Sequence, residues 1–355
     1  MKKLLILAVL AMALMMCATQ AIAQMNAALL YLMIKPGARA LGAGEAFVAT
    51  ADDAWATYYN PAGLGFQKGK KLGLSHTNWL PAFASDLYHE FFAYTWETEG
   101  WGNFGLSAIY MSYGQSVHTD EIGNVLGEFR SFDAALGLSY GSLLTDKSSA
   151  GITMKILYSR LAPFGAGSER GKGIGTSYAL DLGYLKKEFL TKRLSLGVAL
   201  QNVGPTIAYI DADQADPLPQ NLKLGFAFMV FQAEYNSLKL SADFNKSLVG
   251  LPKGDKGKRD PFYLSIFTAW ADEDSNTFRR EIDEVIVNIG AEYTYGSWVS
   301  LRVGFNRDTA FGGGKIFFTA GAGLKYNIFQ FDFAFMPAPE TPLANNTRFS
   351  LGINF

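Results

Sequence analysis

The chain is poor in the residues that build disulfide frameworks and metal centres. Its 355 residues include one cysteine, Cys17, and three histidines, which stand far apart at positions 76, 89 and 118. A single cysteine excludes an intramolecular disulfide and a cysteine-cluster metal site. The scattered histidines lack the spacing of a zinc site. We therefore expect no metal and no cofactor.

Excess charge and long apolar runs are also missing. Lys+Arg 31 against Asp+Glu 32 leaves a net charge of -1, so there is no basic surplus for nucleic acid. The 49% hydrophobic content excludes intrinsic disorder. Beyond Met16, no uncharged apolar stretch reaches the roughly 18 residues of a spanning helix. Any membrane span in the mature chain must therefore be built from strands.

The amino-terminal segment has the pattern of a targeting signal. Two lysines precede an apolar run at residues 4–16, and the triplet AIA at 21–23 has the small-x-small form of a signal-peptidase site. The pattern predicts a signal peptide over residues 1–23 and export of the rest. The alternative is lipidation of Cys17, but the preceding LMM lacks the small residues usual at such a site.

Strand periodicity dominates from about residue 70 onward. Apolar or aromatic residues occupy every second position, with Gly, Ser, Asp, Lys or Asn between them. The clearest runs are 104–110, 136–140, 178–184, 194–200, 222–228, 238–244, 285–295, 299–305, 318–326, 329–335 and 349–355. Several are about ten residues long, which suits a tilted strand that crosses a bilayer. Periodicity alone leaves a secreted β-sandwich open, since its polar face would alternate in the same way.

Aromatic residues at the ends of these runs favour a membrane barrel. They are Tyr110, Tyr140, Tyr184, Tyr293, Tyr295 and Tyr326, the positions expected of interfacial girdles. The interleaved positions carry Asp181, Lys223, Lys239, Asp243, Arg302, Lys325 and Asp332, which would face the lumen. We predict an all-β fold, a transmembrane antiparallel barrel over residues 70–355 with about fourteen strands.

The connections are predicted from the breaks in this pattern. Residues 261–270, together with 278–282, do not alternate strictly and are interpreted as short helix in a periplasmic connection. The longer polar segments 164–173, 211–219 and 337–344 are candidate extracellular loops, because periplasmic turns are short.

Residues 24–69 are rich in Gly and Ala and do not alternate, so we expect an N-terminal hatch, or plug, in the lumen. Asp52 and Asp53 are adjacent, and on an extended chain they would point to opposite sides, which does not suit an acid–base pair. We interpret them as turn and capping residues. Asn60 and Pro61 are interpreted as the start of a turn.

Other apparent motifs carry little chemistry. The glycines at 42–44 and 171–175 do not sit between a strand and a helix, as a phosphate-binding loop requires. Asp211, Asp213 and Asp216 lack the Gly and Glu of a calcium loop. No Gly-x-Ser-x-Gly motif is present. We therefore expect a protein that is not an enzyme.

Two segments of the hatch resemble the opening of the PorV/PorQ family of outer-membrane proteins, itself similar to the FadL fatty-acid transporters. They are ARALGAGEAFVA at 38–49 and ADDAWATYYNPAGL at 51–64, which contains Asp52, Asp53, Asn60, Pro61, Gly63 and Leu64. Further matches to PorV are QNVGP at 201–205, LPQNLKLG at 218–225, DFNK at 243–246, GAEY at 290–293, GAGLKY at 321–326, PLAN at 342–345 and RFSL at 348–351. The hatch motif is carried over as structural, with no binding role assigned.

The resemblance implies a FadL-like barrel of the bacterial outer membrane that acts in type IX secretion. Its partners would be outer-membrane lipid, a translocon barrel, proteins of a surface attachment complex, and cargo proteins with C-terminal signal domains. Terminal Phe355 resembles the signal that the barrel-assembly machinery recognises. Residues 79–83 and 164–170 are candidate cargo contacts.

The rival interpretation is a FadL-like transporter of hydrophobic small molecules, and a purely structural barrel is a third. A transporter should hold a continuous apolar pocket beneath the extracellular loops. A secretion shuttle should keep its lumen filled and expose an apolar patch on its outer face. The sequence alone permits both.

Overall fold

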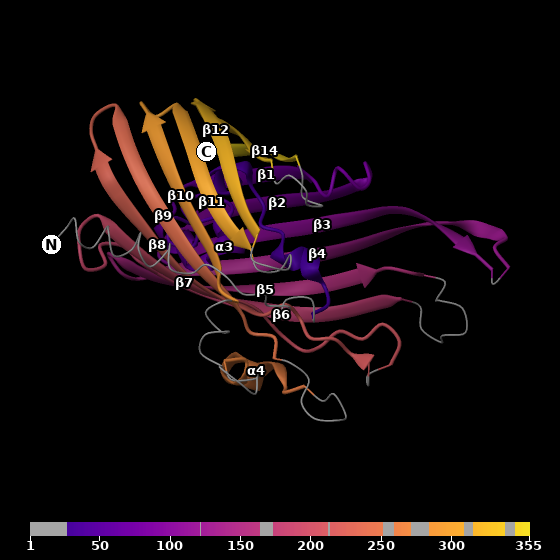
Figure 1. The fold of residues 1–355 in the computed structure, drawn as a ribbon. Coiled ribbons are helices and arrows are strands. Elements are labelled where there is room, and N and C mark those ends of the chain that lie inside the picture. The colour runs from indigo at the N-terminus through magenta and orange to yellow at the C-terminus, as the bar shows by residue number, and fades with distance from the viewer. Residues whose placement is uncertain are drawn as a thin grey trace.

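The computed structural model describes residues 27–120, 122–163, 173–211, 214–250, 259–270, 284–308, 315–337 and 345–355. Fourteen antiparallel strands close into a barrel in which each strand pairs with its neighbours in sequence and β14 pairs with β1 (Figure 1). The predicted fold class and strand number are confirmed. No helix in the described ranges is long and apolar enough to cross a membrane.

The strand bounds are β1 Lys70–Asn78, β2 Leu87–Thr98, β3 Gly102–Thr119, β4 Val125–Thr145, β5 Ser148–Arg160, β6 Ile174–Lys186, β7 Leu194–Val203, β8 Asn221–Gln232, β9 Asn236–Ser247, β10 Ile286–Tyr295, β11 Val299–Asp308, β12 Lys315–Tyr326, β13 Phe329–Met336 and β14 Asn346–Asn354. All the alternating runs of the sequence fall on these strands. Strands β3 and β4 are the longest and extend beyond their neighbours (Figure 1).

Apolar side chains cover the outside of the barrel. Leu136 and Ile156 are 64% and 69% exposed, whereas their neighbours Ala135 and Leu157 point inward and are buried. Such alternation with the apolar face outward is that of a membrane barrel and is the reverse of a soluble barrel.

Aromatic side chains form two rows on this outer face. In one row, Tyr110 lies 6.1 Å from Tyr88 and 5.4 Å from Phe132, measured between ring centroids. In the other, Phe104 lies 5.7 Å from Trp96 and 5.1 Å from Tyr140. Phe104 and Tyr110 are both on β3, so the rows are about 20 Å apart along that strand at about 3.3 Å per residue. This separation suits the girdles that flank the apolar band of a membrane barrel.

The two ends of the barrel differ in their connections. At one end, short turns join β2–β3, β4–β5, β6–β7, β8–β9, β10–β11 and β12–β13. Phe355 lies at the same end, where its N–H donates to the Lys70 carbonyl at 2.8 Å. The other end carries the longer connections, including those after β5, β7 and β9. Since periplasmic turns are short, this second end is the extracellular one.

The helix expected near residues 261–270 is present as α4 (Phe262–Thr268), but its predicted place is wrong. It follows β9, which runs from the short-turn end to the long-connection end, so it lies on the extracellular side (Figure 1). Ser265 of α4 donates to Gln220, just ahead of β8, at 3.4 Å. The expected segment 278–282 lies outside the described residues.

Residues 27–69 lie inside the barrel, and we refer to them as the plug. They contain η2 (Leu30–Met33), α2 (Ala38–Gly42), α3 (Ala56–Tyr59) and η3 (Pro61–Phe66). Ala28 donates to Pro217, between β7 and β8, at 3.0 Å. The plug therefore starts at the extracellular end and reaches the periplasmic end at β1.

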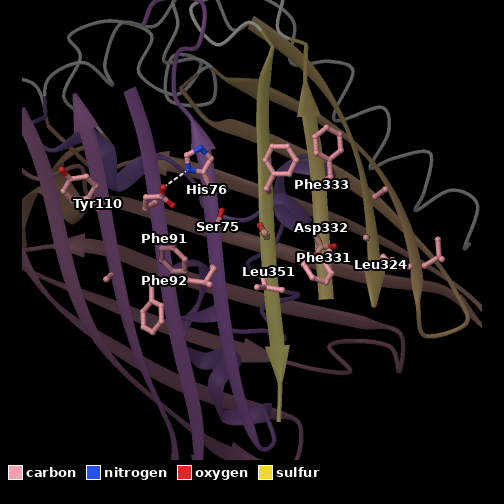
Figure 2. Close-up of a pocket in the computed structure, with 18 residues that line it drawn as sticks. Ser75, His76, Phe91, Phe92, Tyr110, Leu324, Phe331, Asp332, Phe333 and Leu351 are labelled. Carbon is pink, nitrogen blue, oxygen red and sulfur yellow. Dashed lines mark hydrogen bonds and ion pairs between the residues drawn. The ribbon is translucent and has the colours of Figure 1, made fainter. Parts of the chain in front are cut away.

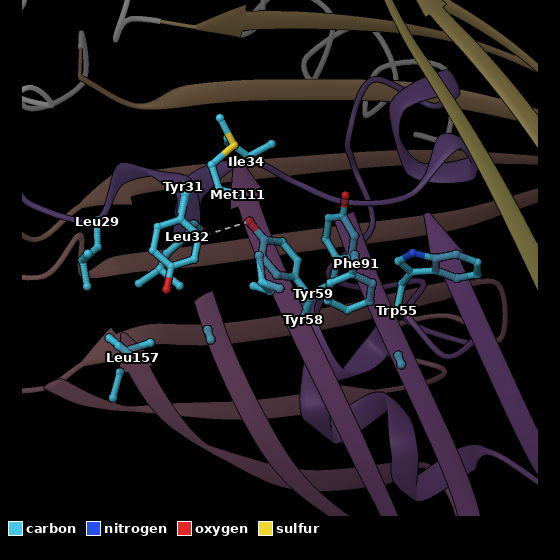
Figure 3. Packing of buried hydrophobic residues seen from close by; sticks show 14 of the residues in the cluster. Leu29, Tyr31, Leu32, Ile34, Trp55, Tyr58, Tyr59, Phe91, Met111 and Leu157 are labelled. Atoms are coloured by element: carbon cyan, nitrogen blue, oxygen red, sulfur yellow. Dashed lines mark hydrogen bonds between the residues drawn. The ribbon is translucent and has the colours of Figure 1, made fainter. Parts of the chain in front are cut away.

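Aromatic side chains of the plug pack against the inner wall. Figure 3 shows Tyr58 and Tyr59 of α3 beside Phe91 of β2, with Tyr31 closer to Leu157 of β5. The Tyr58 and Phe91 rings meet edge to face at 6.1 Å. The apolar core of the molecule thus lies between plug and wall.

Candidate functional site

Glycines on the inner wall allow the plug to approach the strands directly. A Cβ added at Gly183, Gly290 or Gly304 would collide with plug atoms, which are Asn60 Oδ1, the Ala43 carbonyl and the Gly44 nitrogen respectively. The same holds for further inward glycines that face the plug: Gly105, Gly141, Gly151, Gly197, Gly225 and Gly321. Absence of a side chain at these positions permits close backbone packing. The plug is thereby seated against most of the wall.

The Asn-Pro motif fixes the lower part of the plug. Asn60 is fully buried, its Oδ1 accepts from the Ala62 N–H at 3.1 Å, and Pro61 begins η3. Its amide Nδ2 donates to the carbonyls of Val48 at 3.0 Å and Tyr184 at 3.1 Å. Asn60 thus caps η3 and ties two plug segments to β6. This is a structural role in which Pro61 supplies a pre-set first residue.

Gly63 and Leu64 complete this motif. The Gly63 position lies against the Ala51 carbonyl, where no side chain fits, and Leu64 is fully buried. Asn103 of β3 donates to the Leu64 and Gln67 carbonyls, the second at 2.7 Å. These contacts join η3 to β3, whereas Asn60 joins it to β6.

Asp52 and Asp53 converge on one guanidinium. Arg39 of α2 contacts Asp52 at 2.6 Å and Asp53 at 2.9 Å through Nη1, and Glu292 of β10 at 2.9 Å through Nε. Asp53 also accepts from the Trp55 N–H at 3.1 Å, as expected of a turn residue. The two carboxyls were predicted to point apart, but Arg39 draws them together. They serve to lock α2 onto the wall.

The surroundings shift the pKa values of these two carboxyls in opposite directions. Burial raises the pKa of Asp53 to about 6, an effect that Arg39 opposes and the Asp52 charge reinforces. Partial desolvation also raises the pKa of Asp52, whose side chain is about half exposed, but Arg39 and Lys239 outweigh it and hold this pKa below its ordinary value. A pair with divided pKa values has one property of an acid–base site. Because both carboxyl groups already bind Arg39, however, neither is placed as a free acid or base.

A second ion cluster anchors the plug on the other side of α2. Glu45 contacts Lys35 of the plug at 2.9 Å and Arg348 of β14 at 3.0 Å, and it accepts from Asn306 of β11 at 3.0 Å. Burial raises the pKa of Glu45, but Lys35 and Arg348 outweigh it, so the pKa stays below its usual value. Breaking one member of a buried ion cluster is strongly destabilising. Both clusters favour a plug that stays in place.

The outer face of the wall, in contrast, is hollowed. A hollow of about 850 Å³ lies over β1–β3 and β11–β14. Its apolar lining includes Phe92, Leu324, Phe331, Phe333 and Leu351, which point outward from their strands (Figure 2). We call this feature the outer hollow.

A polar pair stands at the extracellular end of the outer hollow. The ring of His76 contacts Glu90 through Nδ1 at 2.7 Å, on the adjacent strand (Figure 2). Tyr110, from the aromatic row described above, lies next to Glu90 in the register of β2 and β3. The outer hollow is therefore apolar at membrane depth and polar at the headgroup level.

Exposed apolar side chains also gather on the extracellular connections. Phe83 after β1, Ile122 after β3 and Phe267 of α4 are 82%, 85% and 75% exposed. Phe83 belongs to the predicted cargo contact 79–83, whereas Trp79 packs against the plug cluster. The other predicted contact, 164–170, lies outside the described residues, as does the signal segment with Cys17. The assembly role of Phe355 stays a prediction.

Sequence reasoning missed Arg39, Glu45, Glu292 and the outer hollow. The two plug anchors join residues that are far apart in sequence, for which alternation gives no signal. The inward glycines did give a signal, because each stands at the polar phase of an alternating strand. The hollow depends on the curvature of seven strands and has no local signature.

The sequence and the fold have recognisable relatives. Residues 17–254 match the family model described as "Type IX secretion system protein PorV". No curated protein matches the sequence.

Solved structures with a similar fold include several hydrocarbon channels. The toluene transporter TbuX of Ralstonia pickettii is 16% identical, with 90% of this chain and 98% of that chain covered and a TM-score of 0.53. The monoaromatic hydrocarbon channel CymD is 13% identical over 91% and 98%, with a TM-score of 0.54. A TodX mutant lacking S2 is 14% identical over 90% and 98%, with a TM-score of 0.55. At these identities the likeness shows the fold alone, which is the FadL-like barrel.

Proposed function

Because the chain belongs to the PorV family of type IX secretion proteins, we propose that it is a non-enzymatic secretion shuttle of the bacterial outer membrane. In this role it receives cargo with a C-terminal signal domain from a translocon barrel and delivers it to a surface attachment complex. The signal peptide over residues 1–23 directs its export.

The observation that carries the proposal is the contrast between lumen and outer face. In the described residues, the plug backbone packs directly against inward glycines of several strands, whereas an apolar hollow of about 850 Å³ opens outward. A transporter needs its apolar pocket inside, beneath the extracellular loops. A shuttle needs apolar surface where partners reach it, and large exposed apolar patches mark such interaction sites.

The two kinds of surface suit two kinds of partner. The outer hollow lies at membrane depth, so it suits the wall of another outer-membrane barrel. Phe83, Ile122 and Phe267 lie on the extracellular connections and suit a soluble cargo domain. A few large side chains that become buried at the centre of an interface often carry most of its binding energy.

Affinity capture from detergent-solubilised outer membranes tests the proposal. The tagged protein should recover a very large barrel and several exported proteins that share one C-terminal domain. The variant Ala322→Trp, which fills the outer hollow, should lose the barrel. Its control, Leu136→Trp, places the same side chain on the outward face of β4, outside the hollow, and should retain the barrel.

Lipid analysis of the same sample tests the rival function, which is transport of hydrophobic small molecules. Hydrophobic small molecules bound without any protein partner would overturn the shuttle in favour of transport. Equal recovery of the barrel by both tryptophan variants would reject the outer hollow as its contact surface.

A further inference from the structure

Strand β9 differs from the rest of the inner wall. The inward positions of β2, β9 and β13 carry no glycine, and β2 and β13 present fully buried alanines to the interior instead, Ala93 and Ala334. The inward residues of β9 are all polar: Ser237, Lys239, Ser241, Asp243, Asn245 and Ser247. The plug therefore meets only polar side chains along β9, whereas every other strand also offers it glycine or apolar contacts.

The contact between plug and β9 is incomplete at Ser241. A small cavity of about 10 Å³ lies there, between Phe47 and Thr50 of the plug and Ser241, Lys239 and Glu292 of the wall. This volume is close to the smallest that holds one water molecule. Thr50 and Ser241 are separated by 3.4 Å between their hydroxyl oxygens. The site is polar on both sides, as a bound water requires.

Buried polar atoms without a partner continue from this cavity toward the extracellular end. They are Asp243 Oδ1, Asn245 Oδ1, and both side-chain polar atoms of Asn288 and Asn221. Each of these residues is at most 2% exposed. Asp243 pairs with Asn288 in the register of β9 and β10, and Asn245 pairs with Lys223 in that of β8 and β9. The unpartnered atoms therefore lie side by side on neighbouring strands.

Buried polar groups are nearly always hydrogen-bonded, since an unpaired one loses its hydration without replacement. Six such atoms lie on adjacent strands next to a cavity of water size, and one kind of ligand that both donates and accepts hydrogen bonds would satisfy them all. Water satisfies amide donors, amide acceptors and a carboxylate alike. At the periplasmic end, Lys239 and Glu292 form an ion pair at 2.8 Å beside the cavity, which continues the line of polar side chains.

We propose that a file of water molecules runs along β9 between plug and wall, and that small ions cross the plugged barrel by this seam. The inference goes beyond secretion, because it assigns a conducting path to a lumen that the plug occupies. A file one water molecule wide carries protons and small monovalent ions and excludes organic solutes.

Cysteine labelling tests the seam with little disturbance, because serine and cysteine are similar in size. A Cys17→Ala background contains no other thiol. Ser241→Cys lies in the seam, and Ser237→Cys lies at its periplasmic entrance. Ser139→Cys and Ser149→Cys are matched controls, since both serines are fully buried on β4 and β5 against the plug side. The probe is Ag⁺ in nitrate buffer, a small monovalent cation that binds thiols tightly.

In folded detergent-solubilised protein, Ser241→Cys should react within about tenfold of the rate of Ser237→Cys. The two control thiols should react at least about a hundredfold more slowly, because they depend on local opening. Labelled Ser241→Cys should then show a lower small-ion conductance in planar bilayers than the unlabelled variant. Labelling as slow as Ser139→Cys, or a conductance that labelling leaves unchanged, would overturn the proposal.

Discussion

Asn60 shows how one side chain can join three parts of the molecule. Its amide donates to Val48 in the plug and to Tyr184 in β6, and its oxygen accepts from Ala62 in η3. The sequence predicted a turn at Asn60 and Pro61, and that local role is what the structure describes. The bonds to Val48 and Tyr184 depend on how the plug is seated in the barrel, so local pattern could not predict them.

The variant Asn60→Ala tests this linkage. It leaves two carbonyls and one N–H buried without a partner, so we expect a loss of about 2–4 kcal/mol in unfolding free energy. Urea titration of the detergent-solubilised protein measures the change. Folded and unfolded barrels are distinguished by their electrophoretic mobility, which heating alters. Asn124→Ala, on the exposed connection after β3, should stay within about 0.5 kcal/mol of the unaltered protein. Equal stability of both variants would mean that Asn60 does not bridge plug and wall.

At the level of elements, alternation predicted the strands well for a physical reason. One face of every strand meets lipid and the other meets a polar or glycine-rich interior, so the period of two is strong throughout. The prediction placed α4 at the wrong end of the barrel, although counting the strands that precede it determines the end. Residues 211–219 precede β8, and two strands later the chain is back at the same end, where α4 follows β9.

The glycines of the inner wall make a prediction about how plug and strands fit. A Cβ at Gly304 of β11 would fall on the Gly44 backbone, which cannot move aside as a flexible side chain would. Gly304→Ala should therefore cost about 1–3 kcal/mol of stability through overpacking. The same urea titration measures it.

Gly352 of β14 offers the matched control. It also faces inward, but the nearest atom to an added Cβ is Gln330 Cβ at 3.6 Å, an ordinary contact. Gly352→Ala should be neutral or slightly stabilising, because alanine restricts the unfolded chain. If both variants lost stability equally, close approach of the plug would not explain the glycines.

For the whole molecule, the path of the plug is the feature that local sequence could not supply. Lack of alternation over residues 24–69 suggested a separate segment in the lumen, but not its direction. The direction comes from Ala28 beside Pro217 at the extracellular end and Lys70 beside Phe355 at the other end. The ion clusters around Arg39 and Glu45 then hold the plug to β10 and β14. These strands are far from the plug in sequence, and only closure of the barrel brings them near it.

This path predicts on which side of the membrane the beginning of the plug is presented. An epitope inserted directly ahead of Ala27 should bind antibody on intact cells, because Ala28 lies beside the extracellular connection between β7 and β8. The same epitope in the β2–β3 turn, beside Trp101, should bind only after the outer membrane is permeabilised, since short turns face the periplasm. Flow cytometry before and after permeabilisation measures both. The reverse labelling pattern would invert the barrel, whereas periplasmic labelling of both sites would keep the barrel and reverse the plug alone.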